Sequence, residues 1–285
     1  MKPWLLFIAL LPGLAVGAKY PLTDEDLKTY SRTGCLLVEG VFSEDEISPI
    51  KELALQMLQY GYQIREESHN TERAEIRLDR NGSQFVYDTN TLVIKRIVWA
   101  CGMHPEFRTL GADKKLKNMV FRVLQTHHAH HLINQLHPKM PNDGVEFKFH
   151  RDIENRRNFD KGWAGENMHN GGFVQTLTAL EAMDEWNGAI EVYPGSHNDS
   201  TPLKNRPETQ DIIAGELQQQ YPPEFVRMQP GDVLLCHPNL AHRSLPNQSN
   251  NSRLLFINGF AAQGAHQPEV KYPGDDSGYL LKISE

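Results

Sequence analysis

The sequence predicts a mainly β fold of the α+β class, in which helices from the first half of the chain pack on a jelly-roll barrel formed by the second half. Two observations predict it. Helix capping signals and apolar residues at helical spacing occur before about residue 130. After that point the chain changes to short alternating apolar runs, separated by Pro, Gly and Asn. Antiparallel strands that close into two packed sheets bury such short runs well.

Two capping boxes predict the first helices. Thr23 with Asp26 marks one helix start, and Ser43 with Glu46 marks another, whose helix is expected to run to about Gly61. Apolar residues three and four apart predict a third helix. In order, this half is expected to contain a helix from about 23, a strand over 35–42, a helix over 43–61, mixed β runs over 77–99, and a helix over 113–125.

Five short runs in the second half have the alternation and the flanking turn residues of strands. They cover 146–152, 173–180, 189–192, 232–236 and 254–260, and one helix is expected at about 206–220. The chain has 285 residues, enough for one sizeable core or two small ones. We expect residues 19–285 to form a single domain.

The first eighteen residues differ from the rest. Lys2 gives a positive start, the segment from Trp4 to Val16 is largely apolar, and small residues follow up to Ala18. This order is typical of a cleavable secretory signal, and the stretch is too short for a comfortable membrane span. We therefore expect the secretory pathway (ER lumen, periplasm or secreted) if the signal is cleaved, the cytoplasm if it is not, and no stable membrane span.

Charge and cysteine content exclude other classes of protein. The formal net charge of −7 argues against nucleic acid as a partner, because phosphate binding needs a basic surface. The chain has three cysteines and no CxxC, which argues against a disulfide framework. Hydrophobic residues make up 39% of the chain, an ordinary globular value.

The segment 146–152 is the first sign of chemistry. Side chains of a strand alternate between its faces, so His150 and Asp152 project from the same face, opposite to Phe147 and Phe149. One nitrogen and one oxygen ligand from one face can occupy adjacent corners of a metal. Two histidines and one carboxylate form the facial triad of non-haem Fe(II) oxygenases, which leaves three positions open for O2 and a chelating 2-oxo acid.

The third ligand is expected to be His242, on a later strand. His237 is the alternative, but His242 is followed by Ser244 and then by Arg253 at the start of an apolar run. An arginine there is costly unless it is paired, and a carboxylate is its natural bidentate partner. Arg253 and Ser244 therefore suggest a site for the far carboxylate of a diacid whose other end chelates the metal.

Four motifs in this order resemble the phytanoyl-CoA dioxygenase family, which includes ectoine hydroxylase. They are His150-Arg-Asp152, the run through Asn187-Gly188 to Pro194-Gly195-Ser196-His197, Pro230-Gly231-Asp232 leading to His242, Ser244, Asn247 and Arg253, and the tail Tyr272-Pro273-Gly274. The resemblance covers roughly 134–279. It implies a double-stranded β-helix, the cupin-like jelly roll, that uses Fe(II), 2-oxoglutarate and O2, with iron on His150, Asp152 and His242 and the cosubstrate on Ser244 and Arg253.

On this basis the chain is expected to be a hydroxylase that releases succinate and CO2 and acts on a small molecule or acyl group that the sequence does not identify. Gln135 and Thr178 are further candidates for lining the cosubstrate pocket from neighbouring strands. Lys139 is left open between a residue that faces the site and a loop lysine. The histidines of 127–131 are read as a solvated or supporting cluster, since no carboxylate accompanies them.

Two other functions remain open at this stage. One is a cupin-type metal protein with isomerase or lyase chemistry, for which Arg253 would be dispensable. The other is a jelly-roll binding module of the secretory pathway without catalysis.

Overall fold

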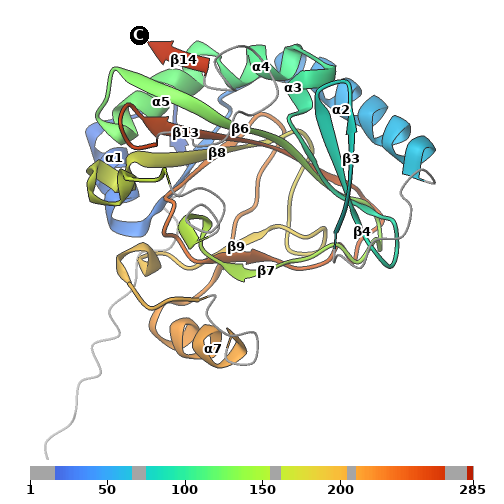
Figure 1. Ribbon diagram of the computed structural model, residues 1–285. Helices are drawn as coiled ribbons and strands as arrows, with labels where there is room; N and C mark the ends of the chain where they lie inside the picture. The colour runs from blue at the N-terminus through green and yellow to red at the C-terminus, as the bar shows by residue number, and fades with distance from the viewer. Residues whose placement is uncertain (1–16, 66–74, 155–161, 204–209, 267–280, 285) are drawn as a thin grey trace, which may run out of the picture.

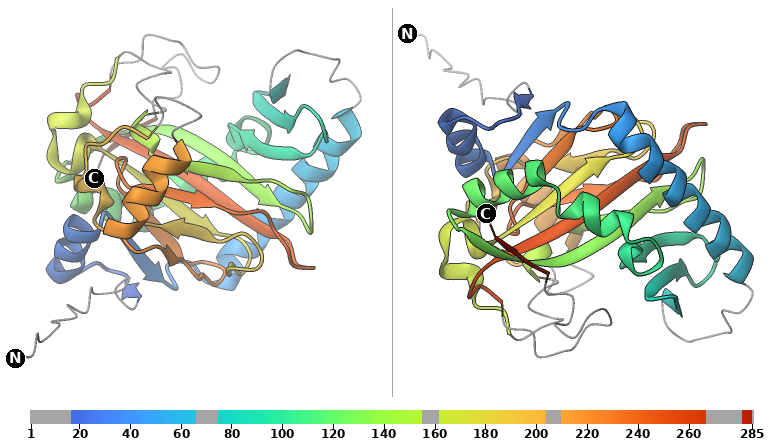
Figure 2. Two further views of the ribbon diagram at one scale, coloured as in Figure 1. Left: turned by 90° about the horizontal axis from the view of Figure 1, so that it is seen from below. Right: turned by 90° about the horizontal axis from the view of Figure 1, so that it is seen from above.

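The computed structural model describes residues 17–65, 75–154, 162–203, 210–266 and 281–284. Two sheets face each other, and helices cover the outer face of the larger one (Figures 1 and 2). The expected fold class, a jelly roll with flanking helices, is confirmed. Within the described residues no helix is long and apolar enough to cross a bilayer.

The large sheet has the strand order β1-β2-β11-β8-β13-β6-β5-β4-β3, and β14 pairs with β6. Its strands are β1 (Ala18–Lys19), β2 (Cys35–Glu39), β3 (Glu75–Arg80), β4 (Ser83–Asp88), β5 (Ile94–Val98), β6 (His128–Lys139), β8 (Phe173–Ala179), β11 (Val233–Cys236), β13 (Arg253–Ala262) and β14 (Leu281–Ser284). The small sheet has the order β10-β9-β12-β7. Its strands are β7 (Phe147–His150), β9 (Ile190–Val192), β10 (Glu224–Phe225) and β12 (His242–Ser244).

The α-helices are α1 (Asp24–Thr33), α2 (Glu44–Ile64), α3 (Ala100–Met103), α4 (Glu106–Gly111), α5 (Lys114–Leu124) and α7 (Gln210–Gln220). Short 3-10 helices are η2 (Gly165–Asn167), η3 (His169–Gly172) and η4 (Ser196–Asn198). Both predicted capping boxes are present, Thr23 with Asp26 and Ser43 with Glu46. Helix α2 continues three residues beyond the expected Gly61. Of the helix expected at 206–220, residues 206–209 lie outside the described residues.

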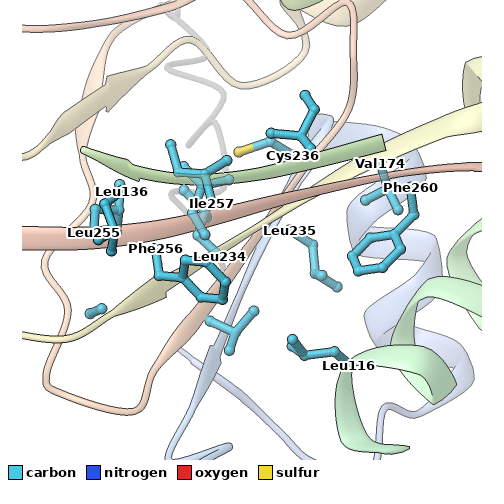
Figure 3. Packing of buried hydrophobic residues seen from close by; sticks show 14 of the residues in the cluster. Leu116, Leu136, Val174, Leu234, Leu235, Cys236, Leu255, Phe256, Ile257 and Phe260 are labelled. Carbon is cyan, nitrogen blue, oxygen red and sulfur yellow. The ribbon is translucent and has the colours of Figure 1, made fainter. Parts of the chain in front are cut away.

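Alternation along the central strand β13 separates the two faces of the large sheet. Phe256 points to the helices, where its ring centroid lies 5.2 Å from that of Phe107 in α4. Figure 3 shows Phe256 and Phe260 on the side of Leu116 of α5. Because neighbours in a strand face opposite ways, Leu255 and Ile257 face the small sheet. Arg253 shares this inner face, so the fold places a buried guanidinium between the two sheets.

All three cysteines are buried and unpaired. Most of the expected signal, residues 1–16, lies outside the described part of the chain. Its last residue, Ala18, belongs to β1 and pairs with Val38.

Candidate metal centre

Strands β7 and β12 of the small sheet bring the predicted ligands together. They pair antiparallel with His242 opposite His150, and the two ring centroids are 4.3 Å apart. Asp152 lies two residues beyond the end of β7. Its carboxylate oxygens are 3.7 Å from His150 Nε2 and 4.0 Å from His242 Nε2. One ligand atom from each residue thus lies within 4.8 Å of the others, close enough to share one ion.

Hydrogen bonds orient both imidazoles towards this cluster. His150 Nδ1 is 2.6 Å from the carbonyl of Lys148, and His242 Nδ1 is 2.9 Å from the carbonyl of Leu240. A carbonyl only accepts, so each Nδ1 carries the proton and donates it. Nε2 is then the ring nitrogen of each imidazole through which a metal can be bound.

The donor set fits non-haem iron. Two imidazoles and one carboxylate, contributed from one side, match the facial triad of non-haem Fe(II) oxygenases. The three side chains are 13–17% exposed, so the centre lies in a recess that small molecules can reach. No second group of three such ligands lies as close together anywhere in the described ranges. His237, the alternative ligand, lies outside the cluster, where its Nδ1 accepts a hydrogen bond from the backbone of Asn239.

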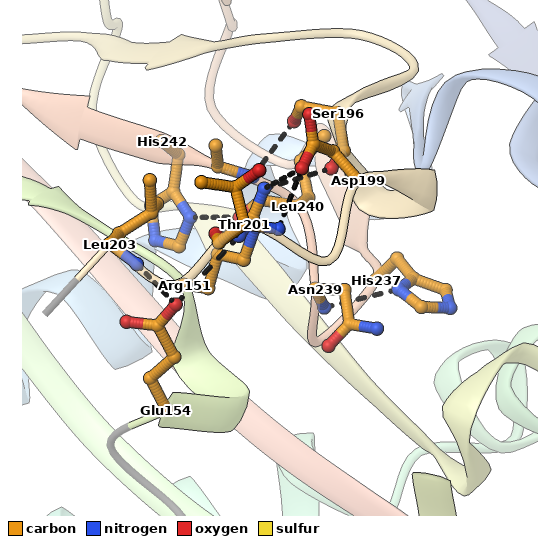
Figure 4. Close-up of polar contacts among 11 residues, drawn as sticks. Arg151, Glu154, Ser196, Asp199, Thr201, Leu203, His237, Asn239, Leu240 and His242 are labelled. Atoms are coloured by element: carbon orange, nitrogen blue, oxygen red, sulfur yellow. Dashed lines mark hydrogen bonds and ion pairs between the residues drawn. The ribbon is translucent and has the colours of Figure 1, made fainter. Parts of the chain in front are cut away.

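Arg151, between the two β7 ligands in sequence, holds this strand to the chain that follows the P-G-S-H motif. Its side chain is 3% exposed and lies 3.8 Å from the Glu154 carboxylate and 4.0 Å from that of Asp199. It also donates to the carbonyls of Ser196 and Thr201 (Figure 4). Sequence reasoning missed this role, because Arg151 points away from the metal face and its partners are up to 50 residues distant.

Ser196 connects the same motif to the strand of the third ligand. Its hydroxyl accepts a hydrogen bond of 3.0 Å from the backbone N–H of Ala241, next to His242. Both metal-bearing strands are therefore held by residues of one loop.

Arg253 lies at the start of β13 and is 2% exposed. Its guanidinium donates to the carbonyl of His137 at 3.0 Å and to that of Gly188 at 2.8 Å. Its Nε finds no hydrogen-bond partner, and no carboxylate within the described residues pairs with it. Burial lowers the pKa of Arg253 to about 10. The group remains charged at neutral pH, so Arg253 is a buried positive charge with no acidic partner among the described residues.

The remaining predicted cosubstrate residues divide between the two faces. Ser244 is two residues after His242 in β12, so it shares the face of that ligand, and it is buried. Gln135 is half-buried, and its amide oxygen is 3.0 Å from His137 Nε2. Thr178 stands opposite Phe256, on the helix side of the large sheet. Thr178 therefore packs under the helices and does not line the space between the sheets, which corrects our expectation.

Lys139, left open by the sequence, is the last residue of β6 and is paired in register with Arg253. It is fully buried, and its ammonium donates to the carbonyl of Leu245. In the histidine run, His131 bonds to Asn258 at 2.8 Å on the helix side, as a supporting residue would. The tail motif Tyr272-Pro273-Gly274 lies outside the described residues.

Comparisons with known proteins agree with this arrangement. The sequence model of the family described as phytanoyl-CoA dioxygenase (PhyH) matches residues 30–255. The dioxygenase lolE1 of Epichloe uncinata is 31% identical over 101 residues, which are 35% of this chain and 37% of that protein. The match thus spans little more than a third of the relative.

Solved structures share the fold. EctD from S. alaskensis with bound Fe has a TM-score of 0.72 at 21% identity, over 91% of this chain and 84% of that one. SnoK, a non-heme alpha ketoglutarate dependent carbocyclase from nogalamycin biosynthesis, has a TM-score of 0.61 at 16% identity, over 85% of each chain. At these identities the likeness shows the fold.

Proposed function

Because the chain belongs to the phytanoyl-CoA dioxygenase family, we propose that it is an Fe(II)- and 2-oxoglutarate-dependent oxygenase that hydroxylates an organic substrate. His150, Asp152 and His242 would hold the iron. Arg253 and Ser244 would bind the far carboxylate of 2-oxoglutarate. The related EctD structure from S. alaskensis with 2-oxoglutarate and 5-hydroxyectoine, which has a TM-score of 0.67 to this chain, supports the same use of the fold.

The observation that carries the proposal is the pairing of a two-His, one-Asp cluster with a buried guanidinium that lacks a carboxylate. Strand β12 connects the metal cluster with the surroundings of Arg253. His242 is at the metal, and the chain reaches Leu245, beside Gly188, three residues later. At about 3.3 Å per residue this is about 10 Å. A five-carbon diacid that chelates iron at one end and meets Arg253 at the other fills such a span.

Iron with 2-oxoglutarate and O2 supplies the oxidising chemistry, in which decarboxylation to succinate and CO2 accompanies insertion of oxygen into a C–H bond. The protein supplies the positions of the groups. The Nδ1 bonds hold both imidazoles with Nε2 towards the metal. Asp152 would supply the carboxylate ligand. Leu255 and Ile257, both nearly fully buried on the inner face, keep water away from the cosubstrate.

Substrate identity and compartment are separate questions. We propose a small organic molecule or an acyl group as substrate. We also propose that residues 1–18 direct the chain to the secretory pathway. N-terminal sequencing of protein expressed with these residues tests the second proposal, and an intact Met1 would contradict it.

Anaerobic titration tests the oxygenase itself. Adding Fe(II) and then 2-oxoglutarate should produce a visible metal-to-ligand charge-transfer band, and admitting O2 should release succinate. Asp152→Ala should lose both signals while it remains folded, and Asp45→Ala, which changes an exposed carboxylate of α2, should keep both. A cupin-type metal enzyme or a binding module would give neither signal in the unmodified protein.

A further inference from the structure

Two free cysteines stand directly opposite each other on neighbouring strands. Cys35 begins β2 and Cys236 ends β11, they are register partners, and they are 1% and 3% exposed. The next pair along the ladder is hydrogen-bonded, since the His237 N–H donates to the Gly34 carbonyl at 2.8 Å. Hydrogen-bonded and non-hydrogen-bonded pairs alternate in an antiparallel ladder, so Cys35 and Cys236 form a non-hydrogen-bonded pair. In such a pair the Cα atoms lie about 4.5 Å apart and the side chains project from the same face.

The surroundings of Cys35 fit this pairing. Its backbone N–H donates to the Thr33 hydroxyl at 3.3 Å, and its carbonyl accepts from the same hydroxyl at 2.7 Å, so both groups are turned away from β11. The two thiols also act on each other electrostatically, because Cys35 adds to the effect of burial in raising the pKa of Cys236. A Cα separation of about 4.5 Å falls within the range of roughly 4.4 to 6.8 Å that disulfides require.

The third cysteine lies on the other face of the large sheet. Cys236 is the register partner of Gln175, three residues before the helix-facing Thr178, so its thiol points away from the helices. Figure 3 shows Cys236 on that side of the sheet. Cys101 belongs to α3, and its backbone N–H donates to Asn134, which also bonds to α4. Of the three thiols, only Cys35 and Cys236 therefore share a face.

We propose that Cys35 and Cys236 form a disulfide when the chain folds in an oxidising environment, and that this bond holds helix α1 and strand β2 on the barrel. The inference goes beyond the oxygenase activity and is independent of the metal. The electron acceptor is a low-molecular-weight disulfide such as oxidised glutathione. One cysteine thiolate attacks it and releases one glutathione, and the other thiolate attacks the mixed disulfide, forms the new S–S bond and releases the second. The two electrons and the two thiol protons pass to the two glutathione molecules.

The bond is expected to form before the two strands close. Burial raises the pKa of the Cys35 thiol to about 12 and that of the Cys236 thiol well above its usual value. Only the thiolate attacks a disulfide, so exchange is slow once both side chains are buried. In the unfolded chain the thiols are exposed and reactive. A disulfide formed at that stage is then buried and protected from reductants.

The bond would lie where the N-terminal segment meets the loop that supports the metal strands. The carbonyl of Thr33 accepts from the N–H of Gly195 at 2.8 Å, and His197 Nε2 lies 3.0 Å from the carbonyl of Ser31. The two cysteines are about 200 residues apart in sequence. A disulfide across so long a loop strongly restricts the unfolded chain, so its effect on stability should be large.

Peptide mapping of the full chain tests the proposal. The protein is produced in parallel in bacterial hosts with a reducing and an oxidising cytoplasm, unfolded in urea with iodoacetamide and without reductant, and digested with trypsin. The oxidised preparation should yield peptide 33–51 joined to peptide 228–243, at a mass two hydrogens below their sum. Peptide 97–108, which contains Cys101, should be alkylated in both preparations. The oxidised protein should also unfold at a urea midpoint at least about 1 M higher than the reduced protein.

Two variants complete the comparison. Cys101→Ala should keep the joined peptides and the difference in urea midpoint. Cys35→Ala should lose the joined peptides, and its two preparations should unfold at the same midpoint. Alkylation of both Cys35 and Cys236 in the unmodified protein from the oxidising host would overturn the inference, whether or not the variants fold, and so would a disulfide that includes Cys101. Equal urea midpoints of the bonded and reduced proteins would overturn the role in holding α1 and β2.

Discussion

Replacing Arg253 by Met should strongly weaken cosubstrate binding while it changes the free energy of unfolding very little. This combination is unusual for a side chain that is only 2% exposed. A buried arginine that serves the fold has carboxylate partners, and its removal leaves them unpaired. Arg253 has none among the residues the structure describes. Its substitution should therefore change the free energy of unfolding of the ligand-free protein very little and should greatly weaken binding of 2-oxoglutarate.

The structure gives the size of both effects. Burial lowers the pKa of Arg253 from its usual value to about 10. At about 1.4 kcal/mol per pKa unit, the charged group is destabilised by about 3 kcal/mol in the folded state. Its removal relieves this cost but leaves the carbonyls of His137 and Gly188 without a donor, at about 1 kcal/mol each. The net change in unfolding free energy is then within about 2 kcal/mol of zero. Losing two charged hydrogen bonds to the diacid costs at least about 3 kcal/mol, a factor of about 100 in Kd.

Urea unfolding of the metal-free protein measures the first quantity, and anaerobic calorimetry with Fe(II) measures the second. Arg151→Met is the matched control. That arginine is equally buried but lies within 4.0 Å of two carboxylates, so its loss should lower the free energy of unfolding by about 3 to 5 kcal/mol. The reasoning is refuted if Arg253→Met is as unstable as Arg151→Met and its folded fraction still binds 2-oxoglutarate normally.

Three further predictions concern the surroundings of this group. Gly188→Ala should lower the free energy of unfolding by about 2 to 4 kcal/mol and weaken 2-oxoglutarate binding. The backbone φ of Gly188 is +83°, and the new methyl group would lie 2.6 Å from Lys139 Cδ. An unchanged urea unfolding curve would contradict this prediction. Thr178→Val should raise the free energy of unfolding by about 1 kcal/mol and leave the affinity for 2-oxoglutarate unchanged. The Thr178 hydroxyl is buried without a hydrogen-bond partner among the described residues, so its removal relieves an unfavourable burial. Weaker 2-oxoglutarate binding in calorimetry would instead indicate that Thr178 lines the cosubstrate cavity. Burial lowers the pKa of Lys139 to about 6, so between pH 6 and 10.5 its amine is neutral in the folded protein and protonated in the unfolded chain. As pH rises through this range, the free energy of unfolding of the ligand-free protein should therefore increase by up to about 1.4 kcal/mol per pH unit relative to Lys139→Met. Parallel pH profiles of urea unfolding for the two proteins would contradict this prediction.

The cluster of His150, Asp152 and His242 was predictable because its signal is local. His150 and Asp152 share a face by strand alternation, and the offset of Ser244 and Arg253 distinguished His242 from His237. The structure brings these residues together on two paired strands, with His150 opposite His242 although the two are 92 residues apart in sequence, which sequence alone left as an assumption.

The errors and omissions arise where the outcome depended on tertiary structure. Strand β8 is buried along its whole length, so its pattern does not distinguish the face towards the metal from the face under the helices. Thr178 was placed on the wrong side for that reason. Lys139 stayed open because its environment depends on β6 continuing for twelve residues, past Pro138. Arg151 was missed because its partners come from a distant loop.

The imidazoles of His150 and His242 each take their orientation from a peptide carbonyl two positions earlier in the chain. Peptide carbonyls are present whatever the side chain, so the aim of the ligands does not depend on the identity of neighbouring residues. Substitutions elsewhere in the site can then accumulate without changing the orientation of the two imidazoles. This tolerance offers a physical reason why chains only 16–21% identical to this one retain the same architecture.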